Sequence, residues 1–109
     1  MTRLAAMRND TTDNSGTDMN RTIEHKPERH RFECTEESMT GTLDYELADD
    51  VMTITHTNVP SALEGRGIAG DLTRNALDTA RSKGWKVRPA CSYARAYINR
   101  HREYQDLLA

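Results

Sequence analysis

The hydrophobic period of the sequence changes across one short glycine-rich segment, and this change restricts the folds open to the chain. From residue 31 to residue 59, apolar and polar residues alternate, as they do in strands with one buried face. After the segment, apolar residues recur every three or four positions, as in an amphipathic helix: Ala69, Leu72, Thr73, Ala76, Leu77 and Ala80. The segment that separates the two patterns is Glu64-Gly65-Arg66-Gly67-Ile68-Ala69-Gly70.

Three runs before the glycines predict strands, at 31–35, 42–47 and 51–59. Ile23 is expected to open a further short edge strand before them, and Gly41 is expected at a turn between the first two runs. The third run is rich in β-branched residues and ends before Pro60, which has no N–H to donate. Strict alternation predicts that one of its faces carries Met52, Ile54, His56 and Asn58.

The region after the glycines predicts a helix, a strand and a second helix. Gly84 suits the C-cap of the first helix, and 85–91 is a short strand that Pro89 weakens. Ser92 is expected to cap a final helix whose stripe contains Tyr93, Tyr97 and Tyr104, with His101 or Arg100 between them. The predicted fold class is therefore α/β (α+β-like), with a mixed sheet formed by an antiparallel meander and then β-α-β-α.

Composition limits the remaining possibilities. A chain of 109 residues is one domain, which we expect at 22–109, and the polar stretch 1–21 reads as a disordered tail. A net charge of −2 does not favour nucleic acid, and no apolar run approaches the roughly 20 residues of a membrane span. The two cysteines, Cys34 and Cys91, suggest a reducing cytoplasmic setting, and the histidines show no metal-ligand spacing.

The glycine segment has the chemistry of an anion site. Glycines at 65, 67 and 70 allow close approach of a ligand to the backbone, and a helix start offers free N–H groups and a favourable dipole. Arg66 could add a charge-assisted contact to a phosphate. A tight strand-to-helix turn without any ligand explains the spacing equally well. The segment lacks the Gly-Lys-Ser/Thr of a Walker loop.

The run Val59-Pro60-Ser61-Ala62-Leu63-Glu64-Gly65-Arg66-Gly67-Ile68-Ala69 resembles the coenzyme-A pyrophosphate loop of the GNAT superfamily of N-acetyltransferases. Pieces at 55–57, 89–92 and 97–104 resemble a subgroup of very short GNAT-like proteins, so the resemblance covers about 22–109 and implies a minimal GNAT fold. It implies acetyl-CoA as substrate, bound by Asn58, Val59, Gly65, Arg66, Gly67, Ile68, Ala69, Gly70 and Arg100. Glu64 stands where the family has Gln or Arg, and its side chain is expected to face away.

The resemblance also implies that strands 51–59 and 85–91 splay apart around the pantetheine arm, with the thioester beside Cys91. Full-size members have two additional helices near the start, for which this chain has no room between Ile23 and Phe32. The acceptor site is therefore expected to be open or completed by another molecule. A monomer or a weak homodimer through an edge at 31–35 is compatible with this arrangement.

Three side chains are candidates for catalysis, and each has a structural alternative. Cys91 is a candidate nucleophile, and its structural alternative is a small buried residue at a strand end. His56 is a candidate general base, and its structural alternative is a hydrogen-bonded core residue. Tyr97 is a candidate general acid or a packing residue of the last helix. The leading hypothesis is transfer of an acetyl group from acetyl-CoA to an amine of a small molecule or protein. The alternatives are a non-catalytic coenzyme-A-binding module and an α/β domain without a ligand.

Overall fold

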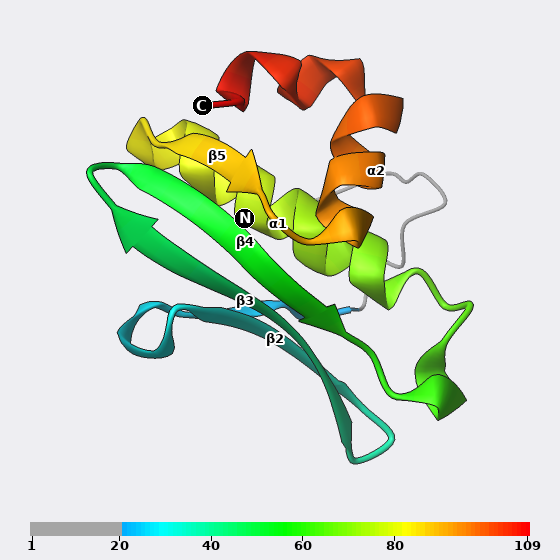
Figure 1. Cartoon of the computed structure of the whole chain (residues 1–109). Helices are drawn as coiled ribbons and strands as arrows, with labels where there is room; N and C mark the ends of the chain where they lie inside the picture. Colours follow the sequence, from blue (N-terminus) through cyan, green and yellow to red (C-terminus); the bar gives the residue numbers. More distant parts are fainter. Residues whose placement is uncertain (1–20) are drawn as a thin grey trace, which may run out of the picture.

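The computed structural model describes residues 21–109, and residues 1–20 of the tail predicted at 1–21 lie outside the described residues. These residues form a five-stranded sheet with strand order β1-β2-β3-β4-β5 (Figure 1). The first four strands pair antiparallel, and β4 and β5 pair parallel. The elements follow in the order β1 (Glu24–Lys26), η1 (Pro27–Arg29), β2 (Arg31–Glu36), β3 (Met39–Ala48), β4 (Val51–Asn58), η2 (Ser61–Leu63), α1 (Ile68–Lys83), β5 (Lys86–Pro89), α2 (Ser92–Arg100) and η3 (Arg102–Leu107).

This order confirms the predicted mixed sheet and its β-α-β-α end, with local differences. Gly41 is not at the turn; it lies buried inside β3 opposite Cys34, and the hairpin turns at Glu37 and Ser38. The outer strand of the sheet is β1 and not 31–35, because β1 covers the first half of β2. Ser92 is the first residue of α2 and not its cap, since the N-cap position is occupied by Cys91.

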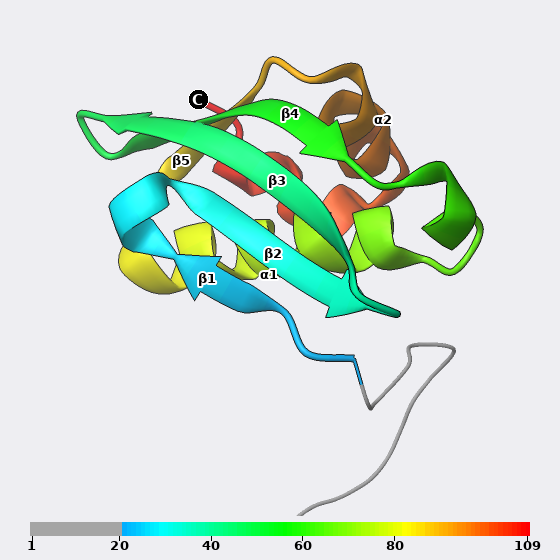
Figure 2. The ribbon, with the colours of Figure 1, turned by 90° about the horizontal axis from the view of Figure 1, so that it is seen from below.

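Within the described residues the helices lie on one side of the sheet, so that the strands stand in front of them in Figure 2. The side chains of β2, β3 and β4 that face the helices are apolar and buried: Phe32, Cys34, Leu43, Tyr45, Met52 and Ile54. Helix α1 completes this core with Leu72, Ala76, Leu77 and Ala80, each without exposed surface. The other face of the sheet carries alternating polar residues such as Thr42, Asp44 and Glu46, which water can solvate.

Strand β4 contains one extra residue relative to β3, midway along the segment where the two strands pair. Tyr45 pairs with Ile54, but Asp44 pairs with His56, so Thr55 has no partner of its own. Such a β-bulge inverts the alternation of side chains that follows it. Thr57 therefore joins Leu43, Tyr45 and Ile54 on the helix side, and His56 joins Asp44 on the open face. The predicted face of Met52, Ile54, His56 and Asn58 is thus wrong beyond Ile54.

An aromatic cluster at the end of the sheet makes the stability of the fold depend on pH. The His25 ring stacks on Phe32 at 4.1 Å, and its Nε2 lies 2.7 Å from the Tyr45 hydroxyl. Burial lowers the pKa of His25 below 6.5; Lys83 and His30 also lower it, and Glu28 raises it. The unfolded chain therefore binds more protons than the folded chain in this range.

We expect the free energy of unfolding to fall as the pH drops below about 6.5, through the lowered pKa of His25. Urea titrations between pH 5 and 7.5 measure this slope. The variant His25→Gln cannot titrate and should have a shallower slope over the same range. Equal slopes for both proteins would contradict the assignment to His25.

Candidate functional site

The glycine segment forms the turn between β4 and α1, and it leaves backbone N–H groups without helical partners. The first N–H within α1 to reach a carbonyl of the turn is that of Asp71, which donates to the Gly67 carbonyl at 3.0 Å. The N–H groups of Ile68, Ala69 and Gly70 precede it in the first turn of the helix. Gly67 is the N-cap, with φ 83° and ψ 11°, a left-handed conformation that favours glycine.

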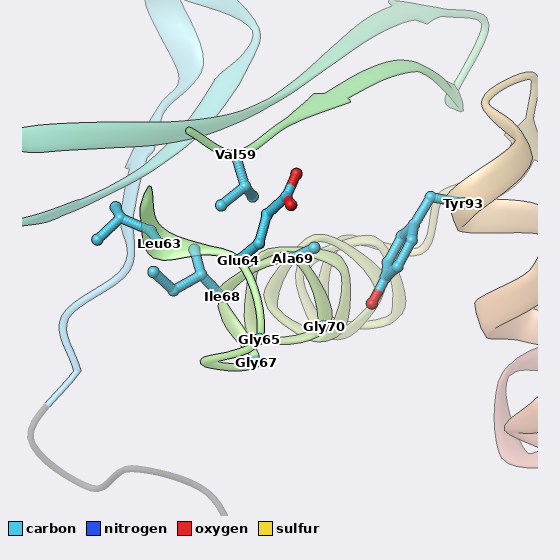
Figure 3. A pocket seen from close by; sticks show the side chains of 9 residues that line it. All are labelled: Val59, Leu63, Glu64, Gly65, Gly67, Ile68, Ala69, Gly70 and Tyr93. Atoms are coloured by element: carbon cyan, nitrogen blue, oxygen red, sulfur yellow. The ribbon is translucent and has the colours of Figure 1, made fainter. Parts of the chain in front are cut away.

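These N–H groups border a cavity of about 210 Å³ between the turn and α2 (Figure 3). Its lining includes most of the residues for which the sequence predicts coenzyme binding: Val59, Gly65, Gly67, Ile68, Ala69 and Gly70. Leu63, Glu64 and Tyr93 complete the lining. The structure therefore brings the predicted loop together around one cavity, and the binding role of these residues stays a prediction.

Two charged residues of the loop are placed differently from expectation. The Glu64 side chain does not face away; it lines the cavity and extends beside Val59 toward the space in front of Tyr93 (Figure 3). Arg66 is not part of the cavity lining. Its Nη1 lies 2.7 Å from a carboxylate oxygen of Glu37, in the β2–β3 hairpin. That ion pair raises the pKa of Arg66 and turns its charge toward the hairpin.

Arg21 lies against the outer side of the loop, and its side chain is only 6 % exposed. Its guanidinium forms an ion pair with Asp71, lies 3.0 Å from Glu36 and donates to the Arg66 carbonyl at 2.8 Å. Burial lowers the pKa of Arg21, but the hydrogen bonds and charges of Asp71 and Glu36 together raise the pKa by more than burial lowers it. The net shift of the pKa is therefore upward. Arg21, which we expected at the end of the disordered tail, thus contacts the domain in the described structure.

Strands β4 and β5 separate where Ile54 pairs with Pro89. The N–H groups of Ala90 and Cys91 both donate to the Ile54 carbonyl, at 3.0 and 2.9 Å, and then the chain turns into α2. From Thr55 to Asn58, β4 continues without a partner in β5. The two strands therefore diverge on the side of the cavity, and Cys91 lies where the divergence begins.

Cys91 is half-buried and contacts Thr57 across this gap, with 3.6 Å between Sγ and Oγ1. Burial raises the pKa of the Cys91 thiol, but the backbone N–H groups of Ala94 and Tyr93 and the Thr57 side chain lower it, and the net shift is downward. Cys91 is the N-cap residue of α2, and the N–H groups of Tyr93 and Ala94 that lower its pKa belong to the first turn of that helix.

The residue opposite Cys91 is thus Thr57, which the sequence reasoning missed, and not His56. His56 is exposed and, because of the bulge, lies on the open face of the sheet. Asn58 is exposed at the end of β4 and lies outside the cavity lining. The role of His56 as a base for Cys91 has no support from this geometry. Alternation alone could not have revealed Thr57, since the inserted residue is recognisable only from the pairing with β3.

Two tyrosines of α2 divide between the cavity and the core. Tyr97 is 7 % exposed and stacks on His101, with 3.9 Å between ring centroids. Tyr93 lines the cavity and directs its hydroxyl toward Gly70 (Figure 3). Burial raises the pKa of both hydroxyls, so they remain protonated near neutral pH. Arg100 is exposed at the end of α2, and its charge lowers the pKa of Tyr93, although it does not line the cavity.

Comparison with known proteins identifies the family of the chain. The model of the GCN5-related N-acetyl-transferase family matches residues 31–107, which include the sheet from β2 onward, the glycine loop and both helices. The chain belongs to this family. The cavity at the start of α1 lies at the segment that the sequence resemblance assigns to the pyrophosphate loop, and this assignment stays a prediction.

A solved structure shares the fold of this GNAT-family chain. It is the NMR solution structure of a GCN5-like protein from Staphylococcus aureus, with a TM-score of 0.65 and 23 % identity over 84 % of this chain and 91 % of that chain. No curated protein sequence matches significantly. No helix within residues 21–109 is long and apolar enough to cross a membrane. The same residues contain no cluster of three or more acidic, histidine or cysteine side chains suited to a metal ion.

Proposed function

We propose that this chain is an acetyl-CoA-dependent N-acetyltransferase that acts on an amine of a small molecule or protein. The observation that carries the proposal is that α2 borders the loop cavity through Tyr93 and begins at Cys91, where β4 and β5 separate. The free N–H groups of Ile68, Ala69 and Gly70 are suited to a pyrophosphate, and the Cys91 thiol of lowered pKa is suited to the thioester end.

The residues around the gap between β4 and β5 supply the polar groups that acetyl transfer needs. Thr57 contacts Cys91, with 3.6 Å between Oγ1 and Sγ, and its backbone N–H is our candidate donor to the oxygen of a reacting thioester. The Tyr93 hydroxyl, protonated near neutral pH, can donate a proton to the departing coenzyme thiolate. Tyr97 was the expected donor, but Tyr93 lies closer to the cavity and takes that role in this proposal.

Titration calorimetry with acetyl-CoA, coenzyme A and ADP tests the binding half of the proposal. A screen of small amines and lysine peptides, which follows release of the free coenzyme thiol, tests the transfer half. Binding together with amine-dependent thiol release supports an acetyltransferase. Binding of coenzyme A without thiol release from any amine favours the non-catalytic coenzyme-A module. That alternative is supported by the exposed position of His56 and by the polar face of β3, which is open to water.

Glu64 gives a direct electrostatic test of the coenzyme site. Its carboxylate borders the cavity that the pyrophosphate would enter, so the two negative charges repel each other. We expect Glu64→Gln to tighten coenzyme A binding by about 3- to 10-fold at low ionic strength, and by less in 0.5 M salt, since exposed charges are screened. Calorimetry at both salt concentrations measures the difference.

Glu46 supplies the matched control for this prediction. It is exposed on β3, pairs with Thr53 and is far from the loop in the sheet register. Glu46→Gln removes the same charge from the chain and should leave coenzyme binding unchanged. Equal effects of the two substitutions would show that net charge, and not the position of Glu64, governs the affinity.

A further inference from the structure

Arg21 connects the start of the described chain to the outer side of the glycine loop, and the carbonyl it holds belongs to the loop itself. Its Nη2 donates to the Arg66 carbonyl at 2.8 Å. In a trans peptide the C=O and the following N–H point in opposite directions. Holding the Arg66 carbonyl toward Arg21 therefore directs the Gly67 N–H away from Arg21. Gly67 itself lines the cavity.

The same guanidinium neutralises a buried carboxylate beside the anion site. Asp71 directly follows Gly70 in the first turn of α1 and is 6 % exposed. One of its carboxylate oxygens pairs with Arg21, and the other lies 3.1 Å from the more exposed Arg74. An unneutralised carboxylate at this point would repel an incoming phosphate and oppose the helix N–H groups that attract it.

The ion-paired charges beside the loop balance only when Arg21 is included. Glu36, Glu37 and Asp71 carry the negative charges, and Arg21, Arg66 and Arg74 carry the positive ones. Arg66 and Arg74 are 39 % and 35 % exposed, whereas Arg21 is 6 % exposed and therefore least screened by water. Its removal would leave an excess of negative charge close to the helix start.

From these contacts we propose that Arg21 is a positioning residue for coenzyme binding, and this inference rests on the proposed function. It orients the Arg66–Gly67 peptide and cancels the charge of Asp71, so that the start of α1 accepts the pyrophosphate of coenzyme A. Arg21 does not need to touch the coenzyme for this role. It acts through the loop backbone and through Asp71.

Calorimetry with coenzyme A on the full chain and five variants tests this role, with melting temperatures measured to confirm folding. Arg21→Ala should weaken binding by about 10-fold or more, the scale of a lost charge-assisted interaction. The double variant Arg21→Ala with Asp71→Asn should recover most of that loss, because the repelling charge is gone. Arg21→Lys should lie between wild type and Arg21→Ala, and Asp71→Asn alone should bind at least as well as wild type.

Arg31→Ala is the matched control, because Arg31 also pairs with an aspartate, Asp44, at 2.7 Å, but on the sheet. It should leave coenzyme binding unchanged. A double variant that binds no better than Arg21→Ala would overturn the inference. Losses of affinity that merely follow losses of melting temperature across the variants would indicate a purely structural role and would overturn it too. Arg21→Ala binding within two-fold of a wild type that binds would overturn it as well. A wild type that binds no coenzyme A would instead contradict the proposed function.

Discussion

Replacement of Cys91 by alanine is expected to lower the rate of acetyl transfer by about 100-fold or more, while coenzyme affinity stays close to wild type. The expected loss follows from a two-step route. The Cys91 thiolate attacks the thioester carbonyl carbon, the bond from that carbon to the coenzyme sulfur breaks, and the coenzyme leaves with a proton from Tyr93 or solvent. A deprotonated amine then attacks the acetyl-cysteine carbonyl carbon. The bond from that carbon to the Cys91 sulfur breaks and regenerates the thiolate, and the proton that the amine nitrogen loses returns to Tyr93 or solvent.

Binding is expected to survive because Cys91 and the anion site lie at different ends of the site. The free N–H groups are at the start of α1, whereas Cys91 precedes α2. The measurements are steady-state thiol release for the rate, calorimetry for the affinity, and mass spectrometry for an acetyl group on Cys91 after incubation with acetyl-CoA alone. Turnover of Cys91→Ala within a few-fold of wild type would contradict the covalent route and favour direct transfer to the amine.

Thr57 offers a second observation on the same thiol. Its side chain and backbone N–H help lower the pKa of Cys91, so Thr57→Val should raise that pKa and slow alkylation of the thiol at pH 7. Cys34 is 1 % exposed and should not compete for the reagent. Thr53→Val, on the opposite face of β4, is the matched control and should leave the alkylation rate unchanged.

The predictable parts of the fold are those that depend on short-range pattern. Alternation located β2, β3 and β4, and the 3.6-residue period with Gly84 located α1 and its end. The order of these elements then required β5 to pair parallel with β4, as it does. The loop glycines could be assigned to one site for the same reason, since the strand before them and the helix after them fix where they lie.

The parts that could not be predicted depend on contacts between distant residues. The bulge at Thr55 is defined by the pairing of β4 with β3. Because of this bulge, Thr57 and not His56 lies beside Cys91. Which tyrosine of α2 faces the cavity depends on how that helix docks on α1, so periodicity could not choose Tyr93 over Tyr97. Arg21 reaches Asp71 across 50 positions of sequence, beyond any local pattern.

The largest loss of coenzyme affinity is expected from Gly67→Val. Gly67 has φ 83°, a conformation that costs a residue with a side chain about 1–2 kcal/mol and a β-branched residue more. Space is not the obstacle, since the nearest atom to an added Cβ would be Arg21 Nη1 at 3.8 Å. The loop can relieve the strain only by rotating its peptides, which turns N–H groups away from the cavity. Loss of two charge-assisted hydrogen bonds, about 3 kcal/mol together, corresponds to roughly 100-fold in affinity.

Gly84→Val separates this effect from a general loss of stability. Gly84 has φ 76° at the other end of α1, and an added Cβ would meet no atom within 4 Å. Both valine variants should therefore destabilise the fold by a similar amount, about 2 kcal/mol, as measured by urea unfolding. Only Gly67→Val should weaken coenzyme A binding in calorimetry. Equal losses of coenzyme affinity in both variants would mean that the loop has no special role and that affinity follows the stability of α1. Unchanged affinity in both variants would mean that coenzyme binding does not depend on the N–H groups at the start of that helix.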